Sequence, residues 1–234
     1  ARLRSYFDET GELVEEGIQL LLSTLRDFLQ ILTYYRVTNQ QWVATASLRH
    51  AANQRTILER IKQEVGVQVR LLSDYEEAYY GFFAIDQSMN VPEGLTVDIG
   101  GGSTEITYFK DGEMLAYESL PFGALSLRLQ FVEGEMLTDK ERKAMKQYIE
   151  NEMESLSWLH AKKVPLIAIG GSARNIGKLH QQMTEYPLDE LHQYEMTLEQ
   201  LKEIDRQIAT HTLSELQKLE AIDKERADTL QPAM

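Results

Sequence analysis

The sequence predicts an α/β fold. Short apolar segments alternate with stretches that have the spacing of amphipathic helices. Serines or glycines stand at several junctions between them, where helices begin and end. Two capping boxes, at residues 138–141 and 197–200, mark the starts of further helices. Together these observations indicate strands that are followed by helices.

The first part of the chain follows this alternation closely. Ser47 and Ser73 are the predicted N-caps of two helices, and Gly66 is the predicted stop of the first of them. The expected elements are a helix over residues 12–36, a strand over 42–46, a helix over 48–65, a strand over 67–72 and a helix over 74–85.

The segment 86–94 contains Asn, Pro and Gly and is the predicted boundary between two domains, 1–93 and 94–234. The second domain begins with strands, and Asp111-Gly112 predicts a hairpin turn between two of them. The expected elements are strands over 95–98, 104–109 and 114–120, helices over 124–132 and 138–160, a strand over 164–169, and helices over 172–183, 198–210 and 213–219.

Composition excludes several classes of protein. The absence of cysteine excludes disulfides and thiolate chemistry. A net charge of −13 argues against a nucleic-acid binder, and no apolar stretch has the roughly 18 residues of a membrane span. The absence of cysteine and of a signal-peptide pattern fits a cytoplasmic protein. The first residue is not Met, so we expect a sequence that begins within something longer. A phosphate-rich ligand would need local compensation by a metal, arginines or backbone N–H groups.

Residues 98–105 are the strongest candidate for such compensation. Asp98 ends an apolar strand, and three glycines, Gly100, Gly101 and Gly102, allow the backbone to approach a ligand closely. Their N–H groups can form an anion-binding nest, to which the hydroxyls of Ser103 and Thr104 add donors. Asp98 and Glu105 bracket the loop with carboxylates, which suit Mg²⁺. The alternative is a glycine-rich hairpin whose carboxylates only face solvent.

Three further loops place polar residues beside a strand or a helix start. Gly170, Gly171 and Ser172 join a buried strand to a helix, whose N-terminus favours anions, and Arg174 follows. Arg49 lies in the first turn of a predicted helix, an unfavourable place for a cation unless an oxyanion is near. Glu76 and Glu77 begin another helix, where a carboxylate held in a cleft can deprotonate water. Each loop also has a structural alternative. The glycines at 170 and 171 could serve packing only, Arg49 could be a solvated arginine, and the two glutamates could only complement the helix dipole.

These loops, taken in order, resemble the exopolyphosphatase / guanosine pentaphosphate phosphohydrolase family, which belongs to the actin-like ATPase superfamily. The resemblance runs along essentially the whole chain. It is carried by six motifs, at residues 44–53, 72–78, 97–105, 119–124, 167–174 and 225–228. It implies two actin-like, ribonuclease H-like domains with an interdomain cleft. The first domain would be N-terminally incomplete, because the family's first phosphate loop is not found here.

Residue roles follow from the resemblance by position. Glu77 is implied to activate the attacking water, and Asp98 and Glu105 to hold catalytic Mg²⁺ or Mn²⁺. The N–H groups of residues 100–103 and 170–172 would cradle phosphate. Arg49 and Arg174 would bind the phosphate chain.

The implied function is hydrolysis of the terminal phosphoanhydride of inorganic polyphosphate. Guanosine pentaphosphate 5′-phosphohydrolysis is the runner-up activity, and a non-catalytic phosphate or nucleotide sensor is an alternative of a different class. A superfamily kinase is a third alternative. The expected partner is therefore a small polyanionic substrate, with no nucleic acid and no membrane. The sequence leaves a homodimer open and does not distinguish the two substrates.

Overall fold

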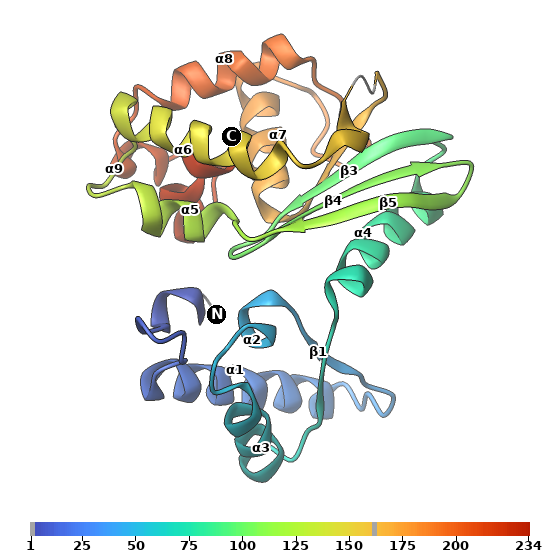
Figure 1. The fold of residues 1–234 in the computed structure, drawn as a ribbon, viewed down its shortest axis with the longest axis vertical. Helices are drawn as coiled ribbons and strands as arrows, with labels where there is room; N and C mark the ends of the chain where they lie inside the picture. The colour runs from blue at the N-terminus through green and yellow to red at the C-terminus, as the bar shows by residue number, and fades with distance from the viewer. Residues whose placement is uncertain (1–2, 161–162) are drawn as a thin grey trace. The chain divides into compact units, whose positions relative to one another are not determined.

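The computed structural model describes residues 3–160 and 163–234 and confirms the predicted α/β class. The chain divides into two compact units, residues 1–77 and 78–234. Each unit contains one sheet with helices beside it (Figure 1). The predicted boundary was at residue 93, whereas this division comes after Glu77. The reason is that most of α4 (Asp74–Ser88) packs with the second sheet, where the Phe82 ring lies 5.4 Å from that of Phe109.

The first unit is built on a two-stranded parallel sheet. Its elements are η1 (Leu3–Tyr6), α1 (Glu15–Tyr34), β1 (Trp42–Ala44), α2 (Ala46–Arg49), α3 (Gln54–Glu64), β2 (Val69–Leu71) and the start of α4. Apolar residues at helical spacing in α1 and α3 bury against each other and against the sheet. Leu22 and Ile61 are fully buried there. This core holds the loops that follow β1 and β2.

The single helix predicted over residues 48–65 is wrong, because the chain forms α2 and α3 with a break at His50–Asn53. Asn53 explains the break. Its side chain accepts from the Leu13 N–H (3.0 Å) and donates to the Leu13 carbonyl (3.0 Å). The N-cap of α2 is Thr45 rather than the predicted Ser47. Arg49 therefore stands at the end of a short helix, not in the first turn of a long one.

The second unit contains a mixed four-stranded sheet in the order β5-β4-β3-β6. Strand β3 pairs antiparallel with β4 and parallel with β6, and β4 pairs antiparallel with β5. Figure 1 shows the helices α5–α8 gathered beside this sheet. The elements are β3 (Glu93–Ile99), β4 (Thr104–Lys110), β5 (Glu113–Leu120), α5 (Ala124–Phe131), α6 (Asp139–Met153), η2 (Ser157–Leu159), β6 (Leu166–Ile169), α7 (Gly170–Met183), α8 (Leu198–Ile208), α9 (Leu213–Leu216), η3 (Lys224–Thr229) and η4 (Gln231–Ala233).

Local sequence signals account for these elements. Asp111 and Gly112 both have positive φ in the predicted hairpin turn between β4 and β5. Thr138 and Thr197 both form the predicted capping boxes. Helix α6 ends at Met153 rather than near residue 160, and the buried Leu156 then packs into the core beneath the sheet. Among the described residues, no helix has both the length and the apolar character that a bilayer crossing requires.

Candidate functional site

In the first unit, the structure pairs Arg49 with the carboxylate predicted to activate water. Arg49 Nη1 donates to Glu77 Oε2 at 2.9 Å and to the Leu72 carbonyl at 2.6 Å. Its Nη2 donates to Asp74. The Arg49 side chain is 13% exposed and that of Glu77 is 19% exposed. Charge-assisted bonds in such a half-buried place hold the Glu77 carboxylate in one orientation.

The start of α4 fixes where Glu77 stands. Ser73 Oγ accepts from the Glu76 N–H, and Glu76 Oε2 accepts from the Ser73 N–H at 2.9 Å, which together form a capping box. The Ser73 N–H, together with the Arg70 side chain, lowers the pKa of Glu76 to about 2. The Glu76 carboxylate thus caps the start of α4. The carboxylate of the next residue, Glu77, accepts a bond from Arg49 instead. The predicted N-cap Ser73 is confirmed.

In the second unit, the two predicted metal ligands lie side by side on neighbouring strands. Asp98 of β3 and Glu105 of β4 are directly opposite in the antiparallel register, and Ser119 of β5 is opposite Glu105. The Cβ atoms of such a pair lie about 4.5–5.5 Å apart and on the same face of the sheet. Glu105 is only 5% exposed, and its Oε1 accepts from the Ser119 hydroxyl at 3.0 Å.

The glycine loop between these strands is fastened to α5. The Gly100 N–H donates to the Ser103 carbonyl at 3.0 Å and closes the turn. The Gly100 carbonyl accepts from the Ala124 N–H at 2.9 Å, and the Gly101 carbonyl accepts from the first turn of α5 as well. Within the described part of the chain, the N–H groups of Gly101, Gly102 and Ser103 have no hydrogen-bond partner. Of the four predicted amide donors, that of Gly100 is thus engaged within the loop, and the other three have no protein partner among the described residues.

The Thr104 hydroxyl bonds to the backbone of a neighbouring segment. It is buried and donates to the Phe122 carbonyl at 2.7 Å. It therefore ties β4 to the segment before α5. Ser103, next to it, is also buried, with 4% of its surface exposed.

Gly123 allows α5 to approach the loop. A Cβ atom at this position would lie 2.5 Å from the Gly100 carbonyl oxygen and 2.8 Å from Gly101 C. Because both contacts are to backbone, the loop itself would have to move. Gly123 lies in the motif at residues 119–124, and this close approach is a structural reason for a glycine there.

We therefore expect Gly123→Ala to distort the glycine loop. The added methyl group should lower the free energy of unfolding by about 1–3 kcal/mol, the usual cost of overpacking, and should weaken binding of inorganic tripolyphosphate. Thermal denaturation and calorimetry would measure the two effects. Gly134→Ala is the matched control, because a Cβ there meets nothing within 4 Å. Equal behaviour of the two variants would contradict this account.

The second predicted loop forms the start of α7. Helix α7 begins at Gly170, and its N-cap is Ile169, which has no side chain that can cap. The predicted N-cap, Ser172, is instead a buried residue of the first turn. Gly170 has φ +89°, and a Cβ there would lie 2.5 Å from Asp98 Oδ1. Glycine is thus required for the Asp98 carboxylate to reach the helix N-terminus, whose partial positive charge favours anions.

The structure adds Arg226 to this end of α7. A Cβ on Gly171 would lie 2.0 Å from Arg226 Nη1, so the guanidinium rests against the Gly171 backbone. Its ion pair with Asp223 is long, at 3.7 Å, and the side chain is half-exposed. Arg174, the predicted phosphate ligand, is exposed two residues beyond Ser172. The motif at residues 225–228 was the only sequence signal for Arg226, and it carried no indication of this contact.

The donors present fit a hard divalent cation. Asp98 and Glu105 supply carboxylate oxygens from adjacent strands, and the described residues contain no cluster of three or more metal-ligating acids or histidines. Mg²⁺ is usually held in this way, by one or two carboxylates together with substrate phosphates and water.

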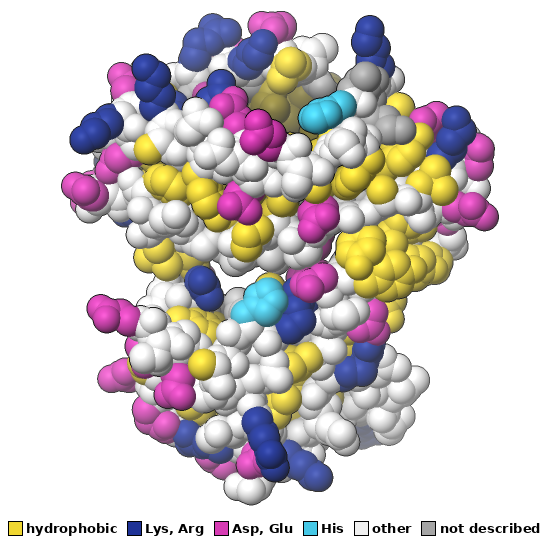
Figure 2. Space-filling model, in the orientation of Figure 1, with side chains coloured by type: hydrophobic (Ala, Val, Ile, Leu, Met, Phe, Trp, Pro, Cys, Tyr) yellow, Lys and Arg dark blue, Asp and Glu magenta, His cyan; other side chains and the backbone are white. Residues whose placement is uncertain are grey.

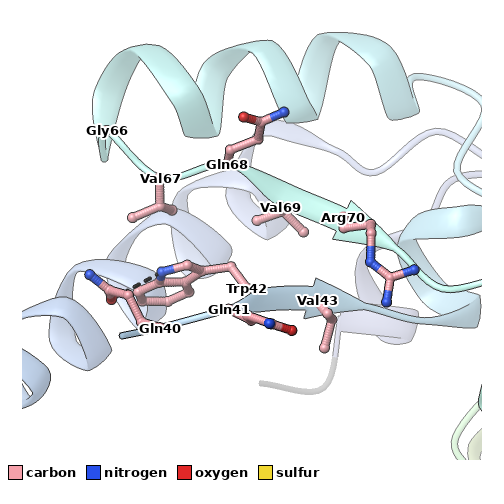
Figure 3. Close-up of a pocket in the computed structure, with 9 residues that line it drawn as sticks. All are labelled: Gln40, Gln41, Trp42, Val43, Gly66, Val67, Gln68, Val69 and Arg70. Carbon is pink, nitrogen blue, oxygen red and sulfur yellow. Dashed lines mark hydrogen bonds between the residues drawn. The ribbon is translucent and has the colours of Figure 1, made fainter. Parts of the chain in front are cut away.

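Other surface features lie apart from these residues. A groove along β1 and β2 is lined by Gln40, Gln41, Trp42, Val43, Gly66, Val67, Gln68, Val69 and Arg70, and includes none of the predicted site residues (Figure 3). On the face drawn in Figure 2, Lys and Arg side chains are interspersed with Asp and Glu. A polyanionic ligand would therefore need local compensation of its charge, as the net charge of −13 also predicts.

Comparison with known proteins gives consistent matches. The model of the Ppx/GppA phosphatase family matches residues 1–234. Exopolyphosphatase 1 of Mycobacterium leprae is 25% identical over 225 residues, which are 94% of this chain and 66% of that protein. Exopolyphosphatase 1 of Mycobacterium tuberculosis H37Rv is 32% identical over 125 residues, 53% of this chain and 36% of that protein. The chain thus spans from about a third to two thirds of the length of these relatives.

Solved structures agree with the fold. The Ppx/GppA family member of Aquifex aeolicus has a TM-score of 0.74 and 27% identity, covering 95% of this chain and 72% of that one. An exopolyphosphatase from Cytophaga hutchinsonii has a TM-score of 0.85 at 24% identity, covering 94% of this chain and 73% of that one, and shows the fold alone. With the family model matched along all 234 residues, the chain belongs to the Ppx/GppA phosphatase family.

Proposed function

We propose that the protein hydrolyses the terminal phosphoanhydride bond of inorganic polyphosphate and releases phosphate. The observation that carries the proposal is the position of two carboxylates beside two groups of backbone N–H donors. One group is in the glycine loop and the other is at the start of α7. Asp98 and Glu105 flank the glycine loop, and Asp98 also lies against Gly170 at the start of α7. Two relatives named exopolyphosphatase support the choice of substrate.

The second unit would bind the phosphate groups. The amides of Gly101, Gly102 and Ser103 are preorganised by the bonds that hold the loop carbonyls to α5. Such fixed donors stabilise charge that develops on phosphoryl oxygens in the transition state. Arg226, against Gly171, adds a cation at the start of α7.

A divalent cation is part of the proposal. Asp98 and Glu105 would hold it, and the Ser119 hydroxyl would keep Glu105 oriented. When bound, Mg²⁺ supplies a Lewis acid that neutralises charge on the phosphate oxygens.

Glu77 is the general base in this proposal. Glu77 accepts the proton of the attacking water, and Arg49 holds its carboxylate through the 2.9 Å bond. We propose that Arg49 also contacts the phosphate chain, a role that requires part of its guanidinium to become free.

Phosphate release by the complete protein tests the proposal. Inorganic polyphosphate and guanosine pentaphosphate should be compared at equal concentration, with Mg²⁺ and with a chelator in its place. We expect Mg²⁺-dependent release from polyphosphate. Release from guanosine pentaphosphate alone would favour the pentaphosphate phosphohydrolase instead, and release from neither would contradict both activities and favour a sensor.

A further inference from the structure

The Arg49 guanidinium is held by three protein oxygens that differ in how firmly they are fixed. The Leu72 carbonyl belongs to the backbone that leads from β2 into α4, and Glu77 is 19% exposed. Asp74 is 46% exposed and is the sole partner of Nη2 among the described residues. Asp74 is therefore the partner that can leave Arg49 most readily.

Two roles are proposed for Arg49, to hold Glu77 and to contact the phosphate chain, and its two terminal nitrogens can serve one role each. Nη1 faces Glu77 and Leu72, so that it keeps the base in place. Nη2 faces a carboxylate that a phosphate oxygen can replace, because both are oxyanions that accept charge-assisted bonds from guanidinium. The Nε atom is buried without a partner in the described part of the chain. One guanidinium donor is thus unsatisfied in this arrangement.

We propose that Asp74 occupies the phosphate-binding face of Arg49 in the absence of substrate and is displaced from it when the phosphate chain binds. The inference rests on the proposed function and adds a residue that regulates affinity at the same site. Glu77 and the Leu72 carbonyl remain on Nη1 throughout. Asp74 thus acts as an internal competitor, and the apparent affinity for substrate is lowered by the fraction of molecules in which it is bound.

Asp139 provides a matched control. It follows the cap residue Thr138 at the first position of α6, as Asp74 follows Ser73 at the first position of α4, and both helices have a glutamate completing the capping box. Asp139 has no ion pair with any described arginine or lysine. Neutralising Asp139 therefore removes a helix-start charge without releasing an arginine.

The experiment measures binding and turnover separately in the complete protein. For Asp74→Asn we expect the Kd for inorganic tripolyphosphate, measured by calorimetry, to fall about two- to fivefold, the range of a partly exposed ion pair. The KM for polyphosphate should fall by the same factor while kcat is retained. Asp139→Asn should change none of these values. An Asp74→Asn variant with unchanged or weaker binding would overturn the proposal.

A double variant separates competition from a general change in charge. If Asp74 acts through Arg49, then Asp74→Asn should have no effect on tripolyphosphate affinity in an Arg49→Gln background. The same gain in both backgrounds would overturn the proposal. If Arg49→Gln does not fold, Arg49→Lys replaces it as the background for Asp74→Asn. A lysine keeps the positive charge but cannot bridge the same partners. Absence of phosphate release by the unmodified protein would instead refute the proposed function, and the binding comparison would still decide the role of Asp74.

Discussion

Glu77→Gln should lower turnover of polyphosphate by at least about 100-fold, the scale on which a general base contributes. The amide cannot take a proton from water, but its oxygen can still accept the bond from Arg49 Nη1. The local structure and the affinity for tripolyphosphate should therefore be retained. Steady-state phosphate release and calorimetry would measure the two properties.

Glu59→Gln is the appropriate control for this variant. Glu59 lies in the same unit, and it forms an exposed ion pair with Arg55 on α3. The same chemical change there should leave turnover unaltered. Near-normal phosphate release by Glu77→Gln would show that another group activates the water.

Asp98→Asn should raise the Mg²⁺ concentration needed for half-maximal activity by about 10- to 100-fold, since loss of even an outer-shell partner of a metal costs that much. Asn is nearly the same size as Asp, so the close contact with Gly170 should be preserved. Titration of Mg²⁺ at saturating polyphosphate measures the change.

Asp111→Asn is the control for the metal experiment. Asp111 is exposed in the β4–β5 turn of the same sheet and has a positive φ that Asn tolerates. Its neutralisation removes the same charge without altering the Asp98–Glu105 pair. An unchanged Mg²⁺ requirement in Asp98→Asn would remove Asp98 from the proposed set of ligands.

The sequence predicted well those features that depend on neighbouring residues. Strands β3 to β6, the Asp111-Gly112 turn and the boxes at Thr138 and Thr197 all follow local rules of alternation, turn chemistry and capping. The helix over residues 48–65 failed because Asn53 bonds to Leu13, 40 positions away in the chain. No local pattern contains that contact.

In the candidate site too, local features could be predicted from the sequence and contacts between distant segments could not. Residue types and strand ends indicated Asp98, Glu105 and both glycine loops, and the structure places Asp98 against Gly170. The contact of Arg226 with Gly171 and the pairing of Arg49 with Glu77 bring together distant segments. Likewise, the bond of Thr104 to Phe122 could not be read from the hydroxyl alone. Such contacts come from the tertiary fold, and spacing in the sequence does not encode them.

The bonds between the glycine loop and α5 give the loop a natural reporter. The amides of Ala124, Leu125 and Ser126 donate to its carbonyls, so their hydrogen exchange rates measure how often the loop opens. A ligand that rigidifies the loop should slow exchange at these three amides, although they belong to a helix and not to the loop. Occupancy of the proposed phosphate site could thus be followed in the intact protein by deuterium exchange, without a chromogenic substrate or turnover.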